Sequence, residues 1–119
     1  KIGGWPEIYF LYSEEVDLSI HIKNLGFIIW YEPQSIVYHV GSQSTGKDSP
    51  LICYYNTRNR LLLYKRNLYG LTRIVSILYQ LMINLILSVK LILHGESALF
   101  KAVFIGSIDF LRGNFYQKK

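Results

Sequence analysis

The sequence predicts an α/β fold in two parts: residues 1–50 combine a helix with short strands, and residues 51–119 form a mostly α-helical tail. Two observations predict the first part. An acid-rich run carries the signals of a helix start, and two later runs, 27–31 and 35–40, are rich in β-branched and aromatic residues. A third observation predicts the tail, because its apolar residues recur with helical spacing.

The first helix is expected to begin at an acidic cluster. Ser13 has a hydroxyl suited to capping a helix, and Glu14, Glu15 and Asp17 follow in the first turn, where the helix dipole favours acids. Gly26 is expected to end this helix. Carboxylates gathered directly behind an aromatic run are suited to taking a proton or facing a cation. Helix capping alone would explain Glu14 or Glu15 singly, so both interpretations stay open.

Two extended segments follow this helix in the sequence. Residues 27–31 and 35–40 flank a turn at Pro33, and both are predicted to be strands. The second segment carries an imidazole, His39, near its end. The polar, glycine-bearing stretch 41–50 is then a loop, either a lid over a substrate or a plain connector.

The longest predicted helix covers residues 71–93 and is long enough to span a bilayer. Its polar residues recur every three or four positions, which gathers them on one narrow face. They are Arg73, Ser76, Gln80, Asn84 and Ser88. Such a stripe favours a helix that lies in a membrane interface or against a hydrophobic partner. A transmembrane helix and a core helix of a larger protein are the alternatives.

Composition narrows the class of partner. The chain has 119 residues, fewer than is usual for an enzyme with both a nucleotide site and an acceptor site, and we expect a portion of a longer protein. Its single cysteine, Cys53, excludes an internal disulfide. The net charge of +5 points to an anionic partner, which is a nucleotide diphosphate, a membrane surface or a nucleic acid. We expect no nucleic acid, because no recognised binding motif accompanies the charge.

The order of several short motifs produces a resemblance to a known family. The motifs are Gly4-Trp5-Pro6-Glu7, Tyr9-Phe10-Leu11-Tyr12, Glu14-Glu15-Val16-Asp17-Leu18, Gly26, Pro33, His39, Tyr54-Tyr55 and Arg58-Asn59. In this order the chain resembles the carboxyl-terminal part of a family 2 glycosyltransferase of the rhamnosyltransferase-like branch. Residues 106–113 are similar to a weaker pattern near the end of that branch. The resemblance implies that residues 1–50 are the acceptor and catalytic part of a GT-A type nucleotide-sugar transferase domain, and that residues 51–119 are a membrane-associating helical tail.

The resemblance also implies a reaction. It implies an inverting, metal-dependent transfer of a sugar from a nucleotide-diphosphate donor to a glycan or lipid-linked acceptor during cell-surface glycan synthesis. Glu15 takes the position of the family's catalytic base, and Glu14 and Asp17 orient the acceptor or the helix start. His39 matches a histidine that holds manganese or magnesium together with an Asp-x-Asp motif, which this sequence lacks.

Substrate contacts follow from the same comparison. Arg58 and Asn59 match a pair assigned to substrate binding, and arginine grips a diphosphate with two parallel hydrogen bonds. Trp5 either stacks on a sugar ring or packs as a core aromatic. The implied location is the cytoplasmic side of the cell membrane, peripheral to its inner face, where anionic lipids attract basic residues.

Two departures from the family pattern support a competing hypothesis. Glu15 stands where relatives have aspartate, and His21 stands where they have arginine. A carboxylate displaced by one methylene, on the order of 1 Å, can slow a reaction a hundredfold. The alternative is therefore a noncatalytic glycosyltransferase remnant that acts only as a membrane- or protein-interaction module.

Overall fold

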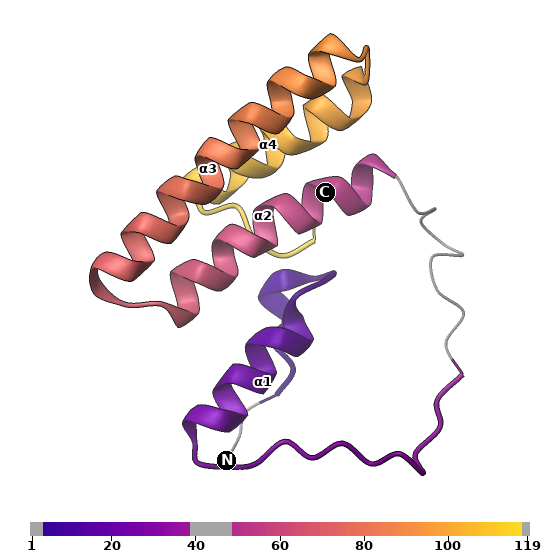
Figure 1. The fold of residues 1–119 in the computed structure, drawn as a ribbon, viewed down its shortest axis with the longest axis vertical. Coiled ribbons are helices and arrows are strands. Elements are labelled where there is room, and N and C mark those ends of the chain that lie inside the picture. The colour runs from indigo at the N-terminus through magenta and orange to yellow at the C-terminus, as the bar shows by residue number, and fades with distance from the viewer. Residues whose placement is uncertain (1–3, 39–48, 118–119) are drawn as a thin grey trace.

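The fold is helical. The computed structural model describes residues 4–38 and 49–117, and within these ranges all regular secondary structure is helix. In chain order the elements are the 3-10 turn η1 (Glu7–Tyr9) and the helices α1 (Glu14–Asn24), α2 (Pro50–Asn67), α3 (Gly70–Leu93) and α4 (Ser97–Arg112) (Figure 1). The prediction of an α/β fold with short strands, and with it the GT-A architecture, is wrong for these residues.

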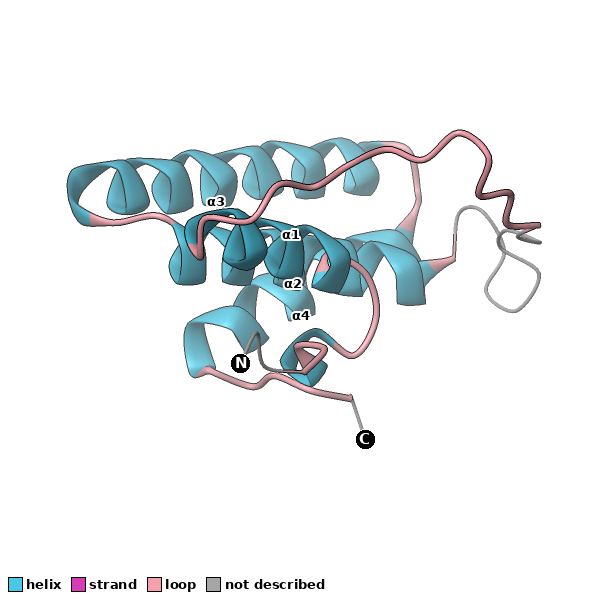
Figure 2. Cartoon of the chain, turned by 90° about the horizontal axis from the view of Figure 1, so that it is seen from below, coloured by secondary structure: helices cyan, strands magenta, loops and turns pink. Residues whose placement is uncertain are grey.

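The predicted strands fail because they have no partner. Residues 27–38 are an extended stretch that leaves α1 and runs apart from the helices (Figures 1 and 2). Their side chains are exposed, with Ile28 at 84% and Tyr38 at 94%. A strand is stable only when a neighbour completes its hydrogen bonds and covers one face. No described segment does so here, and β-propensity alone leaves the chain extended.

The helix predicted at the acidic cluster is confirmed. α1 starts at Glu14 directly after Ser13, although the Ser13 side chain makes no capping hydrogen bond and its φ is 75°. The helix ends at Asn24, two residues before Gly26, whose φ of 86° lies in the left-handed region that glycine tolerates best. The acids therefore stand at the amino terminus of a helix without the hydroxyl cap that the sequence predicts.

The helical tail is also confirmed. The Ser49 hydroxyl accepts a hydrogen bond from the Ile52 amide at 3.3 Å, and Pro50 occupies the first turn, where its missing N–H costs nothing. At the other end, α4 stops at Gly113, whose φ is 75°. The last three helices thus cover the range that the apolar pattern predicts.

α2 is the element that joins the rest of the molecule. α3 and α4 form a hairpin that packs along one side of α2, and α1 lies against its other side (Figure 1). The main core cluster brings η1, α2 and α4 together through Tyr9, Leu61, Leu62 and Phe110. α2 and α4 approach closely at Gly106, where a Cβ would lie 2.9 Å from the Tyr54 carbonyl oxygen.

α3 turns its polar stripe toward the protein and its apolar side outward. Gln80, Asn84 and Ser88 are all buried. The Gln80 amide donates to Asn84 Oδ1 at 2.9 Å, and Asn84 Nδ2 donates to the Ser107 hydroxyl of α4 at 3.1 Å. By length and hydropathy, α3 is the one helix of residues 4–38 and 49–117 that could cross a membrane. Gln80 and Asn84 of the predicted polar stripe therefore pair within the chain.

Candidate functional site

The acids of α1 follow a strained turn. Phe10, Tyr12 and Ser13 have φ values of 63°, 65° and 75°, in the left-handed region. Each such residue other than glycine costs about 1–3 kcal/mol, and the conformation persists only where surrounding contacts enforce it. Strain of this kind clusters at functional sites, and here it immediately precedes Glu14 and Glu15.

Asn59 of α2 holds this turn in place. Its Nδ2 lies 3.1, 2.6 and 2.9 Å from the carbonyl oxygens of Tyr9, Leu11 and Tyr12, and its two hydrogens are shared among them. Arg58 Nε donates to Asn59 Oδ1 at 3.0 Å, which fixes the orientation of the amide. Asn59 is fully buried. One side chain thus satisfies backbone carbonyls that have no helical partner.

Arg58 completes the support from the interior. Nη2 donates to the Tyr9 carbonyl at 2.9 Å and Nη1 to the Tyr116 carbonyl at 2.8 Å. The guanidinium carbon lies 5.4 and 4.9 Å from the ring centroids of Tyr54 and Tyr55. Only 1% of the residue is exposed, so these rings and carbonyls replace water around the charge.

A buried hydroxyl links the guanidinium to a carboxylate. Tyr54 accepts from Arg58 Nη1 at 3.4 Å and donates to Asp109 Oδ2 at 2.9 Å. Burial, together with the hydrogen bond to Asp109, raises the pKa of Tyr54 to about 12. The hydroxyl therefore stays protonated, and Arg58 is coupled to an anion through it.

Glu14 and Trp5 border the same pocket. It has a volume of about 330 Å³, and its lining also includes Glu7, Phe10 and Tyr116. Glu14 Oε2 is buried with no hydrogen-bond partner among the described residues. Trp5 is 59% exposed, which excludes the core interpretation and leaves its ring free to stack. The pocket thus pairs an aromatic face with a carboxylate oxygen able to accept a hydrogen bond.

Glu15, the expected base, lies exposed in the first turn of α1. Its side chain makes no described hydrogen bond; the Glu15 backbone carbonyl accepts one from the Ser19 hydroxyl at 2.7 Å. Glu15 is next in sequence to Glu14, which lines the Trp5 pocket, but Glu15 is not among the residues that line that pocket. No described contact holds the Glu15 side chain in one orientation. The Glu14 side chain differs, because its Oε2 atom is buried.

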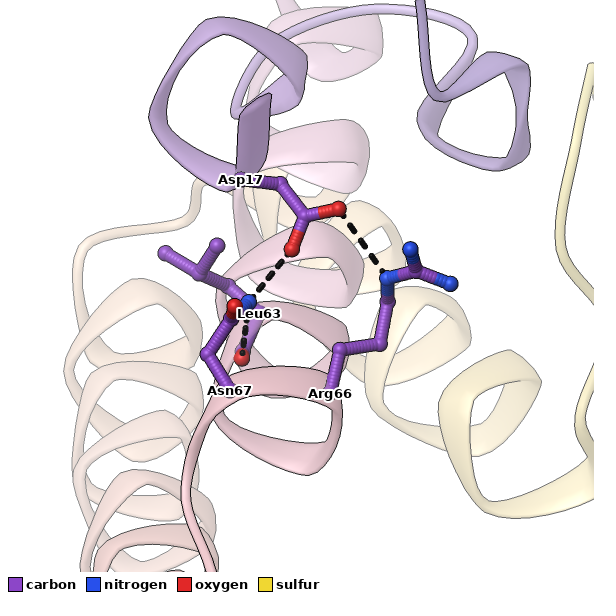
Figure 3. A network of polar contacts seen from close by, with 4 residues as sticks. All are labelled: Asp17, Leu63, Arg66 and Asn67. Atoms are coloured by element: carbon purple, nitrogen blue, oxygen red, sulfur yellow. Dashed lines mark hydrogen bonds and ion pairs between the residues drawn. The ribbon is translucent and has the colours of Figure 1, made fainter. Parts of the chain in front are cut away.

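Asp17 fastens α1 to α2. It is 5% exposed, accepts a hydrogen bond from Arg66 Nε at 3.1 Å and accepts another from Asn67 (Figure 3). Asn67 Nδ2 also donates to the Leu63 carbonyl at 3.1 Å. Asp17 and Arg66 border a second pocket of about 460 Å³ together with His21. Of the two roles predicted for Asp17, these contacts match that of orienting the helix start.

The predicted metal ligand, His39, lies outside the described residues. Among residues 4–38 and 49–117 there is no group of three or more histidine, cysteine or acidic side chains that could hold a metal ion. The described donor set therefore does not fit a divalent cation by itself, and metal binding stays a prediction.

The sequence did not reveal the contribution of Tyr116. Its amide donates to the Ile8 carbonyl at 2.9 Å, its carbonyl accepts from Arg58, and its side chain lines the Trp5 pocket. No motif marks it, because both bonds use its backbone. Arg58 and Asn59 were predicted to contact substrate, and that prediction is untested. Their described donors are directed at groups of the chain itself, which are carbonyl oxygens and the Tyr54 hydroxyl.

Comparison with known proteins gives one relationship. No family model matches the chain, and no solved structure matches it significantly. Over 48 residues the chain is 40% identical to the N-acetylglucosaminyl-diphospho-decaprenol L-rhamnosyltransferases of two Mycobacterium tuberculosis strains, CDC 1551 / Oshkosh and ATCC 25618 / H37Rv. The match covers 40% of this chain and 16% of the length of those relatives. This partial similarity relates the chain to a glycosyltransferase.

Proposed function

We propose that this chain is part of a glycosyltransferase that moves a sugar from a nucleotide-diphosphate donor to a lipid-linked acceptor. The observation that carries the proposal is the placement of Glu14 and Glu15 directly after a strained turn that Asn59 holds through backbone carbonyls. Carboxylates placed at the start of a helix in this way suit proton abstraction. The rhamnosyltransferase similarity supplies the reaction class.

The proposed roles follow the position of each side chain. Glu15, exposed and in the first turn of α1, takes the proton of the acceptor hydroxyl. Glu14 accepts a hydrogen bond from a substrate hydroxyl through its unpartnered Oε2, and Trp5, which lines the same pocket, stacks on a sugar ring. With its proton taken by Glu15, the acceptor oxygen bonds to the sugar carbon from the side opposite the diphosphate. The bond to the diphosphate breaks in the same step, so this single displacement inverts the sugar carbon.

The proposal includes a divalent metal, manganese or magnesium, on the strength of the family resemblance, with His39 as a ligand. The metal would neutralise charge on the departing diphosphate. The described residues do not form its site, so no step above depends on it. The proposed location is the cytoplasmic face of the cell membrane, where a lipid-linked acceptor would be presented.

The experiment uses the protein that contains this segment. Transfer of L-rhamnose from its nucleotide-diphosphate donor to an N-acetylglucosaminyl-diphospho-polyprenol is measured with and without manganese, because the relatives' names indicate this sugar and acceptor. Glu15→Gln should abolish transfer and leave donor binding nearly unchanged. Glu14→Gln is the matched control and should retain more activity than Glu15→Gln.

Two outcomes would change the proposal. Loss of sugar transfer in Glu14→Gln, together with unchanged transfer in Glu15→Gln, would reassign the catalytic base to Glu14. Absence of transfer with every nucleotide sugar, in a protein that still folds, favours the noncatalytic interaction module, to which the glutamate at position 15 and the histidine at position 21 already point.

A further inference from the structure

We propose that the outer face of the α3–α4 hairpin docks on a lipid bilayer that carries anionic headgroups. This face is defined by exposed apolar side chains: Leu71, Ile74, Val75, Leu78, Tyr79, Met82, Leu85, Ile86, Val89, Ile92 and Leu93 of α3, and Phe104 and Leu111 of α4. The inference rests on the proposed function for its lipid-linked acceptor, and it names the surface that brings the protein to that acceptor.

The orientation of α3 is the first argument. Gln80, Asn84 and Ser88 face the protein and are at most 7% exposed, whereas Leu71 is 75% and Leu85 is 65% exposed. A helix at the surface of a water-soluble protein has the opposite arrangement, with its apolar stripe against the core. Hydrogen bonds to Asn84 and Ser107 fix the inward stripe, so α3 cannot rotate its apolar side inward without breaking them. The outer face therefore requires an apolar environment.

Charge identifies that environment as a lipid surface. α3 contains no carboxylate, and exposed cations accompany the hairpin at Arg73, Lys90, Lys101 and Arg112. The one acid within α4, Asp109, is occupied by hydrogen bonds from Tyr54 and Asn114. An amphipathic surface of large apolar residues flanked by lysine and arginine binds anionic membranes. The aliphatic parts of the lysine and arginine side chains lie along the apolar region, and their charged ends reach the lipid headgroups.

The packing of α4 favours docking over crossing. Its inner face is fixed to α2, where Gly106 fits so closely that a Cβ would lie 2.9 Å from the Tyr54 carbonyl oxygen. α2 carries exposed Arg60, Lys65 and Arg66. Drawing the hairpin through a bilayer would either separate α4 from α2 or bring these cations toward the hydrocarbon, at high cost. The hairpin is therefore expected to lie along the surface with α2 on its aqueous side.

Vesicle flotation of the chain tests the proposal. Vesicles contain phosphatidylcholine alone or with added phosphatidylglycerol, and circular dichroism verifies that each variant is folded. The wild-type chain should float with the anionic vesicles and be released by alkaline carbonate. Leu78→Gln/Val89→Gln should lower the partition coefficient about tenfold, because two apolar side chains are lost from the contact. The matched control, Ile28→Gln/Val37→Gln, changes two apolar residues elsewhere that are even more exposed, and it should bind normally.

A second pair of variants tests the charges. Lys90→Gln/Lys101→Gln should weaken binding to anionic vesicles severalfold, because each basic residue near the surface contributes electrostatic attraction. Lys23→Gln/Arg60→Gln removes the same charge from α1 and α2. Arg60 borders the inward side of α3, beside Gln80 and Asn84, and not its outer face, so this pair should have the smaller effect. An equal effect of both pairs would overturn the role assigned to the hairpin cations.

The remaining outcomes would also overturn the proposal. Flotation that ignores lipid charge removes the anionic requirement, and resistance to carbonate indicates a spanning helix. Normal vesicle binding by Leu78→Gln/Val89→Gln would mean that the outer face does not contact the bilayer. A stable dimer in sedimentation, with this face buried between two copies, would assign the face to a second copy of the chain. Vesicle binding by the chain, without any sugar transfer by the protein that contains it, overturns the proposed function alone. Transfer to a detergent-solubilised acceptor without vesicle binding overturns only the docking surface.

Discussion

Asn59 Nδ2 lies 2.6 Å from the carbonyl oxygen of Leu11, a residue 48 positions earlier in the chain. The same nitrogen lies 2.9 Å from the Tyr12 carbonyl, on the strained turn that precedes the acids. A helix side chain is thus the support for a conformation that the turn would not adopt by itself. This relationship leads to the first two predictions.

Asn59→Asp should lower the free energy of unfolding by about 3 kcal/mol, since it removes a buried donor and places an acceptor against carbonyl oxygens. Urea unfolding measures the change. The control is Asn56→Asp, one turn earlier and exposed, where the same substitution should matter little. Similar small losses at both positions would mean that Asn59 does not hold the turn.

Arg58→Lys should lower kcat about tenfold or more in the protein that contains this segment and leave the donor Kd nearly unchanged. Lysine keeps the charge but cannot reach the Tyr9 carbonyl, the Tyr116 carbonyl and Asn59 together, so the acids lose their alignment. Single-turnover kinetics and donor titration separate the two quantities, with exposed Arg60→Lys as the control. A parallel loss of donor affinity would instead support a direct substrate contact by Arg58.

Gly106→Ala should lower the thermal midpoint. The new Cβ would lie 2.9 Å from the Tyr54 carbonyl oxygen and 3.2 Å from Thr57 Cβ, and overpacking of this kind costs about 1–3 kcal/mol. Alanine recovers about 1 kcal/mol in helix propensity, which is insufficient because the obstructing atom belongs to the backbone. Circular dichroism during heating measures the shift. Exposed Ser97→Ala is the control, and an unchanged midpoint for Gly106→Ala would contradict the close approach of α2 and α4.

The stability contributed by Tyr54 should decline at alkaline pH. Its folded pKa is about 12, above the usual value of 10.0, so its contribution is complete below pH 10 and falls as the pH rises toward 12. In this window the unfolded chain releases a proton that the folded chain retains. Urea unfolding of wild type and Tyr54→Phe at successive pH values measures the effect. The difference in unfolding free energy between wild type and Tyr54→Phe should shrink as the pH rises from 10 to 12. A difference that grows over this range would contradict the prediction.

The sequence predicted the helices well because their signals are local. Ser49, Pro50 and Gly113 mark the boundaries of α2 and α4 through contacts within a few residues. The strands predicted at 27–31 and 35–40 do not form within the described residues 27–38, because β-propensity requires a partner and local composition cannot supply one. The polar stripe on α3 was recognised, but its orientation depends on Ser107, which lies on a different helix.

Only part of the candidate site could be predicted from the sequence, because some of its contacts use the backbone. Donor side chains such as Arg58 and Asn59 can be recognised, whereas their acceptors are backbone carbonyls that every residue possesses. The left-handed φ of Phe10 and Tyr12 has no sequence signature either, since glycine is the residue expected there. The acids could therefore be identified, but the structure that supports them could not.

The position of Arg58 has a consequence for the order of folding. Its hydrogen bonds join it to Tyr9, 49 residues before it, and to Tyr116, 58 residues after it. Contacts of such separation form slowly, because large loops must close first, whereas neighbouring helices such as α3 and α4 pair early. The strained turn that precedes Glu14 is thus expected to assemble last and to open first. In hydrogen exchange, amides of residues 9–13 should lose protection before those of α2, so the part that positions Glu15 is also the least stable cooperative unit.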